Sequence, residues 1–202
     1  MNGWRRLALT AATVALSVTE PALATPGEWT SCIESTASSR DLQIAACTAV
    51  IRTRQPVQSE LPVAYYSRGH AYAEKSQPIR ALADFERALQ LKPNYPEALL
   101  GRGEILAQKG KWRRAVWDYD RAIRLKPDFA DAYVDRAIAL DTLHEYSRAI
   151  ADFDHALRLR PNDSWLEFLR EGAKLANGDV SGHDAIARAK EPYEKPLTGP
   201  NP

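Results

Sequence analysis

The amino-acid sequence predicts an all-α protein in which antiparallel helix pairs stack into a solenoid. The stretch "RALADFERALQLKP" from Arg80 has apolar residues at three- and four-residue intervals and stops at a proline, as an amphipathic helix does. Related stretches return 34 residues later at Arg114 and again at Arg148. The segments that begin at Ala64, Ala98 and Ala132 repeat at the same interval. Such a period is typical of one helical unit stacked in an array.

Each unit is predicted to contain two helices joined by a short turn. We expect the first helices over about 63–75, 97–109 and 131–143, and the second helices to end before Pro93, Pro127 and Pro161. Neither helix can bury its apolar face alone, so neighbouring units must complete each other's core. Small residues recur where the two helices of a unit approach each other, at Gly69, Gly103 and Ala137, at Ala81, Ala115 and Ala149, and at Ala88, Ala122 and Ala156.

The repeated positions resemble those of the tetratricopeptide repeat. The first full unit carries the residues of that motif at Tyr65, Gly69, Tyr72, Ala81, Phe85, Ala88 and Pro93. The resemblance implies a right-handed superhelical solenoid with repeats at 62–95, 96–129 and 130–163. It also indicates a degenerate N-terminal helix pair at 25–61 and a degenerate C-terminal capping repeat at 164–190. With its predicted leader, the chain is similar to exported tetratricopeptide proteins of Gram-negative bacteria.

The two ends of the chain are expected to lie outside the solenoid. Residues 1–24 have a basic start at Arg5 and Arg6, an apolar run from Leu7 to Val18 and a small-residue cleavage site at 22–24. The run is too short to span a bilayer, so we interpret it as a removed signal peptide rather than a membrane anchor. No other segment could cross a membrane, and the expected location is periplasmic or secreted. The proline-rich tail 191–202 is predicted to be disordered.

The charge balance argues against a nucleic-acid partner. Removing residues 1–24 takes away two arginines and one glutamate and leaves equal numbers of basic and acidic residues. Nucleic-acid binders normally carry a basic excess, because neutralising phosphates supplies most of their affinity.

Both cysteines, Cys32 and Cys47, lie near the predicted mature N-terminus. An even cysteine count in an exported protein usually indicates a disulfide. We expect two antiparallel helices at about 31–37 and 41–54, joined by a turn around 38–41, with the bond stapling one to the other. Closing such a loop contributes about 3 kcal/mol in the chain-entropy model. Free thiols remain an alternative, whereas metal or redox chemistry lacks further ligands and a Cys-x-x-Cys motif.

Two rows of opposite charge share the repeat period. Arginines recur at a place where the family often has leucine, and aspartates recur on the second helices. The arginines could form an anion-binding row, but the shared period and opposite sign favour internal ion pairs. Breaking such a pair when it is buried could cost about 3–5 kcal/mol. The arginines are Arg68, Arg102, Arg136 and Arg170, and the aspartates are Asp84, Asp118 and Asp152.

The resemblance places partner binding in a concave groove lined by the first helices. The six groove places of the three clear units give eighteen residues, of which six are acidic and none is lysine or arginine. The carboxylate clamp of peptide-binding relatives is therefore absent, and the groove should prefer basic or neutral segments. Alternatively, the acids only keep the surface soluble. The predicted contacts are Tyr66, His70, Glu74, Glu97, Leu100, Glu104, Asp131, Val134, Asp135 and Asp141, with Trp165 and Phe168 as further apolar contacts.

Nothing in the sequence resembles a catalytic motif. The four histidines lack metal-ligand spacing and no glycine-rich loop follows a strand. We therefore expect a non-catalytic interaction scaffold of the cell envelope without a cofactor, which binds a protein or peptide. One alternative is a module that self-associates through its ends or through Trp117, whose indole could equally pack against Arg113 or Arg121. A second is a small-ligand receptor or enzyme that uses the acidic groove.

Overall fold

The computed structural model describes residues 25–33, 39–53 and 59–179, and all regular structure within these ranges is helical. The predicted signal peptide, the second helix of the C-terminal cap and the tail from residue 191 lie outside the described residues. The helices are α1 (Pro26–Ile33), α2 (Arg40–Thr53), α3 (Leu61–Glu74), α4 (Pro78–Leu91), α5 (Pro96–Gln108), α6 (Trp112–Leu125), α7 (Ala130–Thr142), α8 (Tyr146–Leu159) and α9 (Ser164–Ala176).

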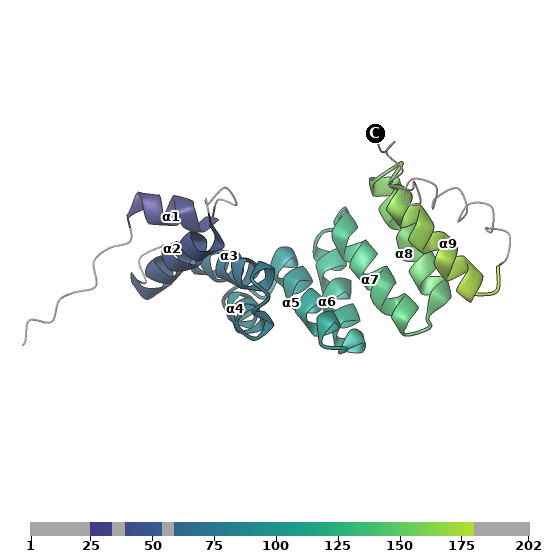
Figure 1. Ribbon diagram of the computed structural model, residues 1–202, viewed down its shortest axis with the longest axis horizontal. Helices are drawn as coiled ribbons and strands as arrows, with labels where there is room; N and C mark the ends of the chain where they lie inside the picture. Colours follow the sequence, from purple (N-terminus) through teal and green to yellow (C-terminus); the bar gives the residue numbers. More distant parts are fainter. Residues whose placement is uncertain (1–24, 34–38, 54–58, 180–202) are drawn as a thin grey trace, which may run out of the picture.

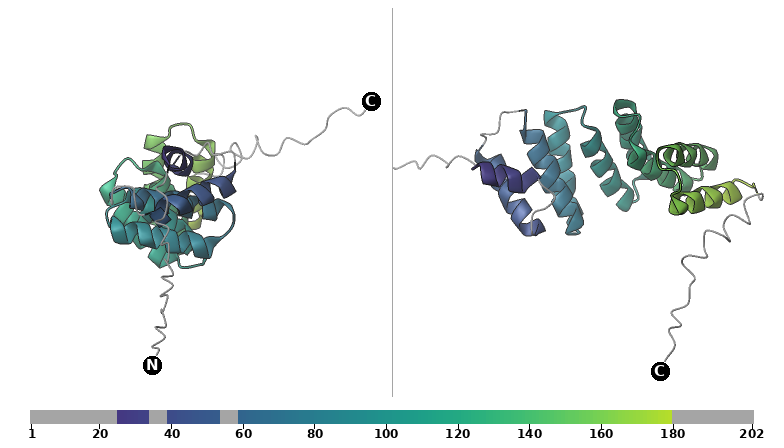
Figure 2. Two further views of the ribbon diagram at one scale, coloured as in Figure 1. Left: turned by 90° about the vertical axis from the view of Figure 1, so that its left-hand side faces the viewer. Right: turned by 90° about the horizontal axis from the view of Figure 1, so that it is seen from above.

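The helices form a row of antiparallel pairs, which confirms the predicted all-α solenoid (Figures 1 and 2). The first helices α3, α5 and α7 contact one another in sequence, whereas α4, α6 and α8 each contact the first helix of the following unit. The first helices therefore make up an inner layer, and the second helices an outer layer. None of the described helices is both long and apolar enough to cross a bilayer.

The turns within the three units share one backbone feature. Ser76, Gly110 and His144 occupy the same place in successive units, and their φ angles are +55°, +69° and +62°. A left-handed residue directly after the first helix reverses the chain within a few residues. The second helices α4, α6 and α8 end two residues before Pro93, Pro127 and Pro161, as the proline signals predict.

Glycines let aromatic rings enter the space between helices. The rings of Phe85 and Tyr119 are each 1% exposed. An ideal Cβ on Gly103 would lie 2.4 Å from Cε1 of Tyr119, and one on Gly101 would lie 2.7 Å from Cζ of Phe85. These rings fill the helix interface only because the facing residues have no side chain.

The N-terminal pair differs from its prediction at the start of α1, which begins at Pro26 rather than at residue 31, while residues 34–37 of the predicted helix lie outside the described residues. Thr25 and Glu28 form a reciprocal capping box: the Glu28 amide donates to Thr25 Oγ1 (3.2 Å), and the Thr25 amide donates to Glu28 Oε2 (2.7 Å). Pro26 follows at the first helical position, where a missing N–H costs nothing. These local signals start the helix earlier than the cysteine spacing suggests, whereas α2 lies within a residue of its predicted limits.

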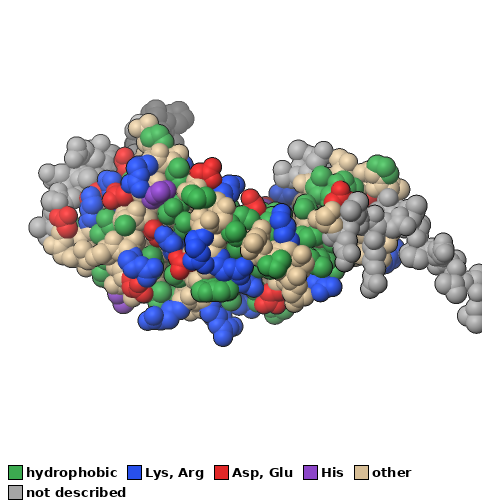
Figure 3. Space-filling view, turned by 180° about the vertical axis from the view of Figure 1, so that it is seen from behind, with side chains coloured by type: hydrophobic (Ala, Val, Ile, Leu, Met, Phe, Trp, Pro, Cys, Tyr) green, Lys and Arg blue, Asp and Glu red, His purple; other side chains and the backbone are tan. Residues whose placement is uncertain are grey.

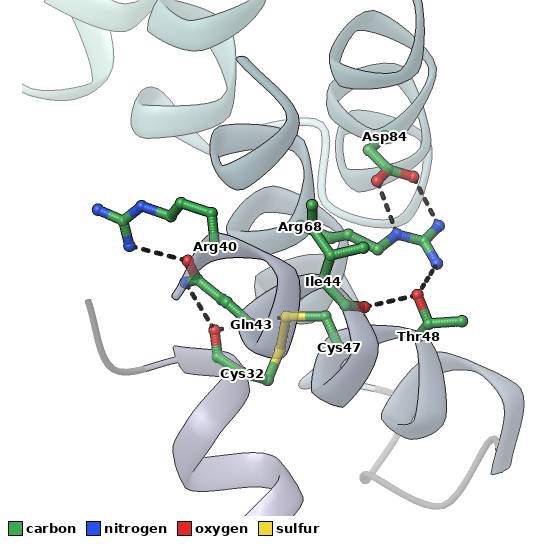
Figure 4. Close-up of a disulfide and its surroundings, with 8 residues drawn as sticks. All are labelled: Cys32, Arg40, Gln43, Ile44, Cys47, Thr48, Arg68 and Asp84. Carbon is green, nitrogen blue, oxygen red and sulfur yellow. Dashed lines mark hydrogen bonds and ion pairs between the residues drawn. A yellow bond between two sulfur atoms is a disulfide. The ribbon is translucent and has the colours of Figure 1, made fainter. Parts of the chain in front are cut away.

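A disulfide joins α1 to α2 (Figure 4). Cys32 and Cys47 are fully buried, and their Cα atoms are 4.6 Å apart. Gln43 also ties the two helices together, because its side-chain amide donates to the Cys32 carbonyl at 3.1 Å. The cysteines pack with Val50 and with Ala64 of α3. The cross-link therefore belongs to the same small core that attaches the N-terminal pair to the first full repeat.

Three arginines of the first helices hold the aspartates of their own units through two parallel hydrogen bonds. Arg102 donates from Nε to Asp118 Oδ2 (2.8 Å) and from Nη2 to Oδ1 (2.5 Å). Arg68 binds Asp84 in the same way (Figure 4), as does Arg136 with Asp152. The three carboxylates are 5%, 0% and 6% exposed. The guanidinium groups thus point at buried carboxylates and not at solvent.

Three of the four arginines in the row also contact the preceding unit. Arg136 donates to Asp120 Oδ1 at 2.6 Å and Arg170 donates to Asp154 Oδ1 at 3.2 Å. Arg68 instead donates to Thr48 Oγ1 of α2 at 3.0 Å. Arg170 has no aspartate of its own unit among the described residues and pairs with the neighbouring Glu171. This backward contact is readable in the sequence, because Glu86, Asp120 and Asp154 also recur at 34-residue intervals.

We expect the replacement Asp118→Asn to lower the free energy of unfolding by about 3 kcal/mol, because it leaves the Arg102 charge without its buried partner. The matched control is Asp154→Asn, whose side chain is 44% exposed and lies 3.2 Å from its arginine. This control should cost less than about 1 kcal/mol. Urea unfolding followed by circular dichroism measures both values, and equal losses would contradict the structural role of the buried pair.

A second pair of variants tests the aromatic packing. Gly103→Ala should destabilise the fold by about 1–3 kcal/mol, since the added methyl group overlaps the Tyr119 ring. Gly172→Ala in α9 should instead stabilise it by about 0.5–1 kcal/mol, because nothing lies within 4 Å of the added Cβ. Thermal unfolding of the two variants reports both signs, and stabilisation by Gly103→Ala would refute the tight contact.

Candidate partner-binding groove

The predicted contact residues all lie on the inner layer of first helices, which we call the groove face. Helix α3 carries Tyr66, His70 and Glu74, α5 carries Glu97, Leu100 and Glu104, and α7 carries Asp131, Val134, Asp135 and Asp141. The upper outline of the molecule dips between its two ends when it is seen from behind (Figure 3). The 34-residue period thus brings residues far apart in the sequence onto adjacent helices.

Apolar members of the groove face differ in how much surface they offer. Val134 is only 6% exposed and belongs to the main core, so the expectation that it contacts a partner is corrected: it supports the groove from behind. Tyr66 and Leu100 are half-buried against the same core. The Tyr66 ring packs 5.2 Å from that of Tyr95 and 6.0 Å from that of Phe85. On α9, Trp165 is 46% exposed and continues the groove register.

Three of the groove acids already have cationic partners within the chain. Lys126 Nζ lies 3.5 Å from Glu97 Oε1, and Arg160 pairs with Asp131. Glu74 pairs with Arg40 of the N-terminal helix pair. These contacts are not predicted from the sequence. The available signal is that Lys126 and Arg160 occupy the same place in successive units. The first member of that series, Lys92, forms no ion pair within the described ranges, and its Nζ lies 4.5 Å over the Tyr95 ring.

The remaining acids include two neighbours, Glu104 on α5 and Asp135 on α7, which we call the central carboxylates. Neither forms an ion pair or a hydrogen bond with another side chain in the described part of the chain. Burial raises the pKa of Glu104 to about 7, with a further contribution from Asp135 and Asp131. Burial likewise raises the pKa of Asp135 to about 6, with Asp131 adding to the effect and Arg160 opposing it.

The surroundings of the central carboxylates explain these pKa values. Tyr119 lies behind them, 1% exposed, and its own pKa is raised by burial and then by the charges of Asp135 and Glu104. Carboxylates in such a setting are poorly hydrated and repel each other when both are ionised. When the two carboxylates are ionised, neither is held in an ion pair within the described residues, and a cation from outside would relieve their repulsion.

Two further predicted contacts, His70 and Asp141, lie on the groove face away from the central carboxylates. His70 is exposed, and its Nδ1 lies 3.5 Å from Glu74 Oε1. Asp141 is half-buried near the end of α7. No group of three or more His, Cys, Asp or Glu within the described ranges is arranged to hold a metal ion.

Comparisons with known proteins agree with this geometry. Two family models described as tetratricopeptide repeat match residues 62–95 and 103–173, and together they span about half of the chain. No curated protein sequence matches the chain.

Several solved structures share the fold. MamA from Desulfovibrio magneticus RS-1 is 19% identical with a TM-score of 0.67, over 76% of this chain and 85% of that one. YrrB, described as a tetratricopeptide repeat protein with an unusual peptide-binding site, is 16% identical with a TM-score of 0.64, over 75% and 77% of the two chains. The first repeat domain of RPAP3 (Spaghetti), bound to the HSP90 peptide SRMEEVD, is 20% identical with a TM-score of 0.57, over 58% and 93%.

The central carboxylates predict an unusual dependence of stability on pH. Because folding raises their pKa values, their contribution to stability is present below the unfolded pKa values and is lost as the pH rises through 6 to 7. The double variant Glu104→Gln/Asp135→Asn removes this loss. It should be more stable than the native chain by about 1–2 kcal/mol near pH 8 and nearly equal to it near pH 4. Thermal unfolding at both pH values measures this, and an equal difference at both would contradict the raised pKa values.

Proposed function

Because the chain belongs to the tetratricopeptide repeat family, we propose that it is a non-catalytic scaffold that holds a segment of a partner protein in the groove formed by α3, α5 and α7. The observation that carries the proposal is the pair of central carboxylates, Glu104 and Asp135, which are half-buried and form no ion pair among the described residues. A lysine or arginine of the partner would supply the missing charge.

The pattern of paired and unpaired acids around this position supports a defined subsite. Glu97 and Asp131 are partly neutralised by Lys126 and Arg160, so the net negative potential is concentrated at the central carboxylates. A partner cation bound there would lower both pKa values and favour the ionised forms. Tyr66 and Leu100 offer half-buried apolar surface beside it. The preferred segment therefore combines one basic side chain with apolar neighbours.

The peptide chemistry of structural neighbours gives a useful contrast. RPAP3 was solved with the HSP90 peptide SRMEEVD, which has three acidic residues. The groove face of the present chain has no lysine or arginine of its own at the eighteen groove places. An acidic peptide of that kind would meet like charge here, so we expect discrimination against it.

We further propose that the scaffold works in the periplasm or outside the cell. The disulfide between Cys32 and Cys47 supports this setting, since such bonds persist mainly in oxidising compartments. The predicted leader at 1–24 argues in the same direction.

The binding proposal can be tested by panning a random peptide library displayed on phage against the purified protein. We expect enrichment of peptides with lysine or arginine and without acidic residues. The variant Glu104→Gln/Asp135→Asn should lose this enrichment and bind a selected peptide about 10- to 100-fold more weakly, as expected for the loss of a partly buried charge pair. The affinity of the native chain should rise from about pH 5.5 to pH 8 as the carboxylates ionise.

A matched control replaces one glutamate and one aspartate elsewhere. Glu167→Gln/Asp128→Asn changes two exposed residues outside the predicted contacts and should leave enrichment and affinity unchanged. Enrichment of acidic peptides, or equal losses in the two double variants, would exclude the central carboxylates as the binding subsite.

A further inference from the structure

The outer face of α6 carries one continuous row of cations around an exposed indole. Trp117 follows Arg113 by four residues and Arg114 by three, Arg121 follows Trp117 by four, and Arg124 follows Arg121 by three, so these residues share one side of the helix. Trp117 is 55% exposed. The Arg121 guanidinium lies 4.9 Å over the indole and donates to the Pro93 carbonyl at 2.9 Å, which fixes the orientation of both groups. We call these five residues the α6 stripe.

The charges of the α6 stripe are available to a ligand. The side chains of Arg113, Arg114 and Arg124 are exposed and form no ion pair or hydrogen bond with the rest of the described chain. The acids of α6 do not compensate them, because Asp118 is held by Arg102 and Asp120 by Arg136. Both acids of α6 are thus paired with arginines of the first helices, and they do not offset the positive charge on the outer face of α6. In Figure 3, Lys and Arg side chains gather over the middle of the molecule and along its lower edge.

A cavity continues the α6 stripe at the start of the helix. Its volume is about 460 Å³, and it is lined by Gly110, Lys111, Trp112, Arg113, Arg114 and Leu143. Three of the six lining residues are cationic and none is acidic, while Trp112 and Leu143 supply apolar surface. The hollow is shallow and open to solvent, and its lining suits a phosphate group attached to an apolar body.

The equivalent faces of the neighbouring outer helices lack this composition. At the five places of the α6 stripe, α4 has Ile79, Arg80, Ala83, Arg87 and Gln90, and α8 has Ser147, Arg148, Ala151, His155 and Arg158. The stripe is therefore a property of the middle repeat and not of the repeat motif.

From these observations we propose that the α6 stripe docks the protein reversibly on a bilayer surface rich in anionic phospholipid, with a phosphorylated headgroup entering the cavity at Lys111. An indole among arginines is the composition that helices use at the boundary between headgroups and acyl chains. Anionic headgroups attract cations within reach of the surface. The groove face lies on the opposite layer, so docking would leave it open; the proposal stands independently of the groove.

The test is flotation of the protein, in the form isolated from its host cells, with vesicles of phosphatidylglycerol and phosphatidylcholine or of phosphatidylcholine alone. We expect binding to the anionic vesicles only. Arg113→Gln/Arg124→Gln should weaken it roughly thirtyfold, because each cation near such a surface contributes about 1 kcal/mol. Trp117→Ala should weaken it as well and reduce the blue shift of tryptophan fluorescence on binding.

Matched controls separate the stripe from general charge and aromatic content. Arg52→Gln/Arg158→Gln removes two exposed cations elsewhere, and Trp165→Ala removes an exposed indole of the groove side; both should bind vesicles as the native protein does. Equal binding to both vesicle types, or equal losses in stripe and control variants, would overturn the proposal. So would failure to bind anionic vesicles together with binding of polyglutamate or DNA through Arg113 and Arg124, which would assign the stripe to an acidic protein or a nucleic acid.

Discussion

The stack depends on one recurring interaction, the two-pronged contact between a first-helix arginine and a buried aspartate sixteen residues later. A carboxylate with no exposure has a high cost unless its charge is matched and its oxygens are hydrogen-bonded. The guanidinium meets both needs only in one orientation, so it fixes how the two helices of a unit face each other. Two of these arginines, Arg68 and Arg136, also contact the preceding unit, through Thr48 and Asp120. In these two cases, one arginine side chain joins the two helices of its own unit and also ties that unit to the one before it.

Most of the architecture could be predicted from the sequence because every unit meets the same kind of neighbour. A position that packs in one repeat packs in the next, so the 34-residue period reveals the core, the turns and the arginine and aspartate rows together. Prediction failed where the period ends. Helix α1 begins at a capping box formed by Thr25 and Glu28, whereas α3 to α8 have no side-chain cap at their start.

The charges of the groove face were harder to predict because they depend on ion pairs with residues outside the eighteen groove places. The family register correctly indicates the helices that form the inner layer, but it cannot tell that Lys126 and Arg160 fold back onto Glu97 and Asp131. Nor does it separate Val134, which is packed in the core, from Leu100, which is half-exposed at an equivalent place. The six acids on this face therefore differ in their surroundings: within the described residues, Glu104 and Asp135 are half-buried neighbours that form no ion pair, whereas Glu74, Glu97 and Asp131 are paired.

The buried arginine–aspartate pairs and the exposed α6 stripe differ in how they respond to ionic strength. Mobile ions screen exposed charges over about 8 Å at physiological salt, but they do not enter a dry helix interface. Asp118 with no exposed surface is shielded from them, whereas Arg113, Arg114 and Arg124 stand in solvent. Added salt should therefore weaken the attraction of the α6 stripe for anionic ligands, and it should leave the buried ion pairs that hold the helices together unchanged.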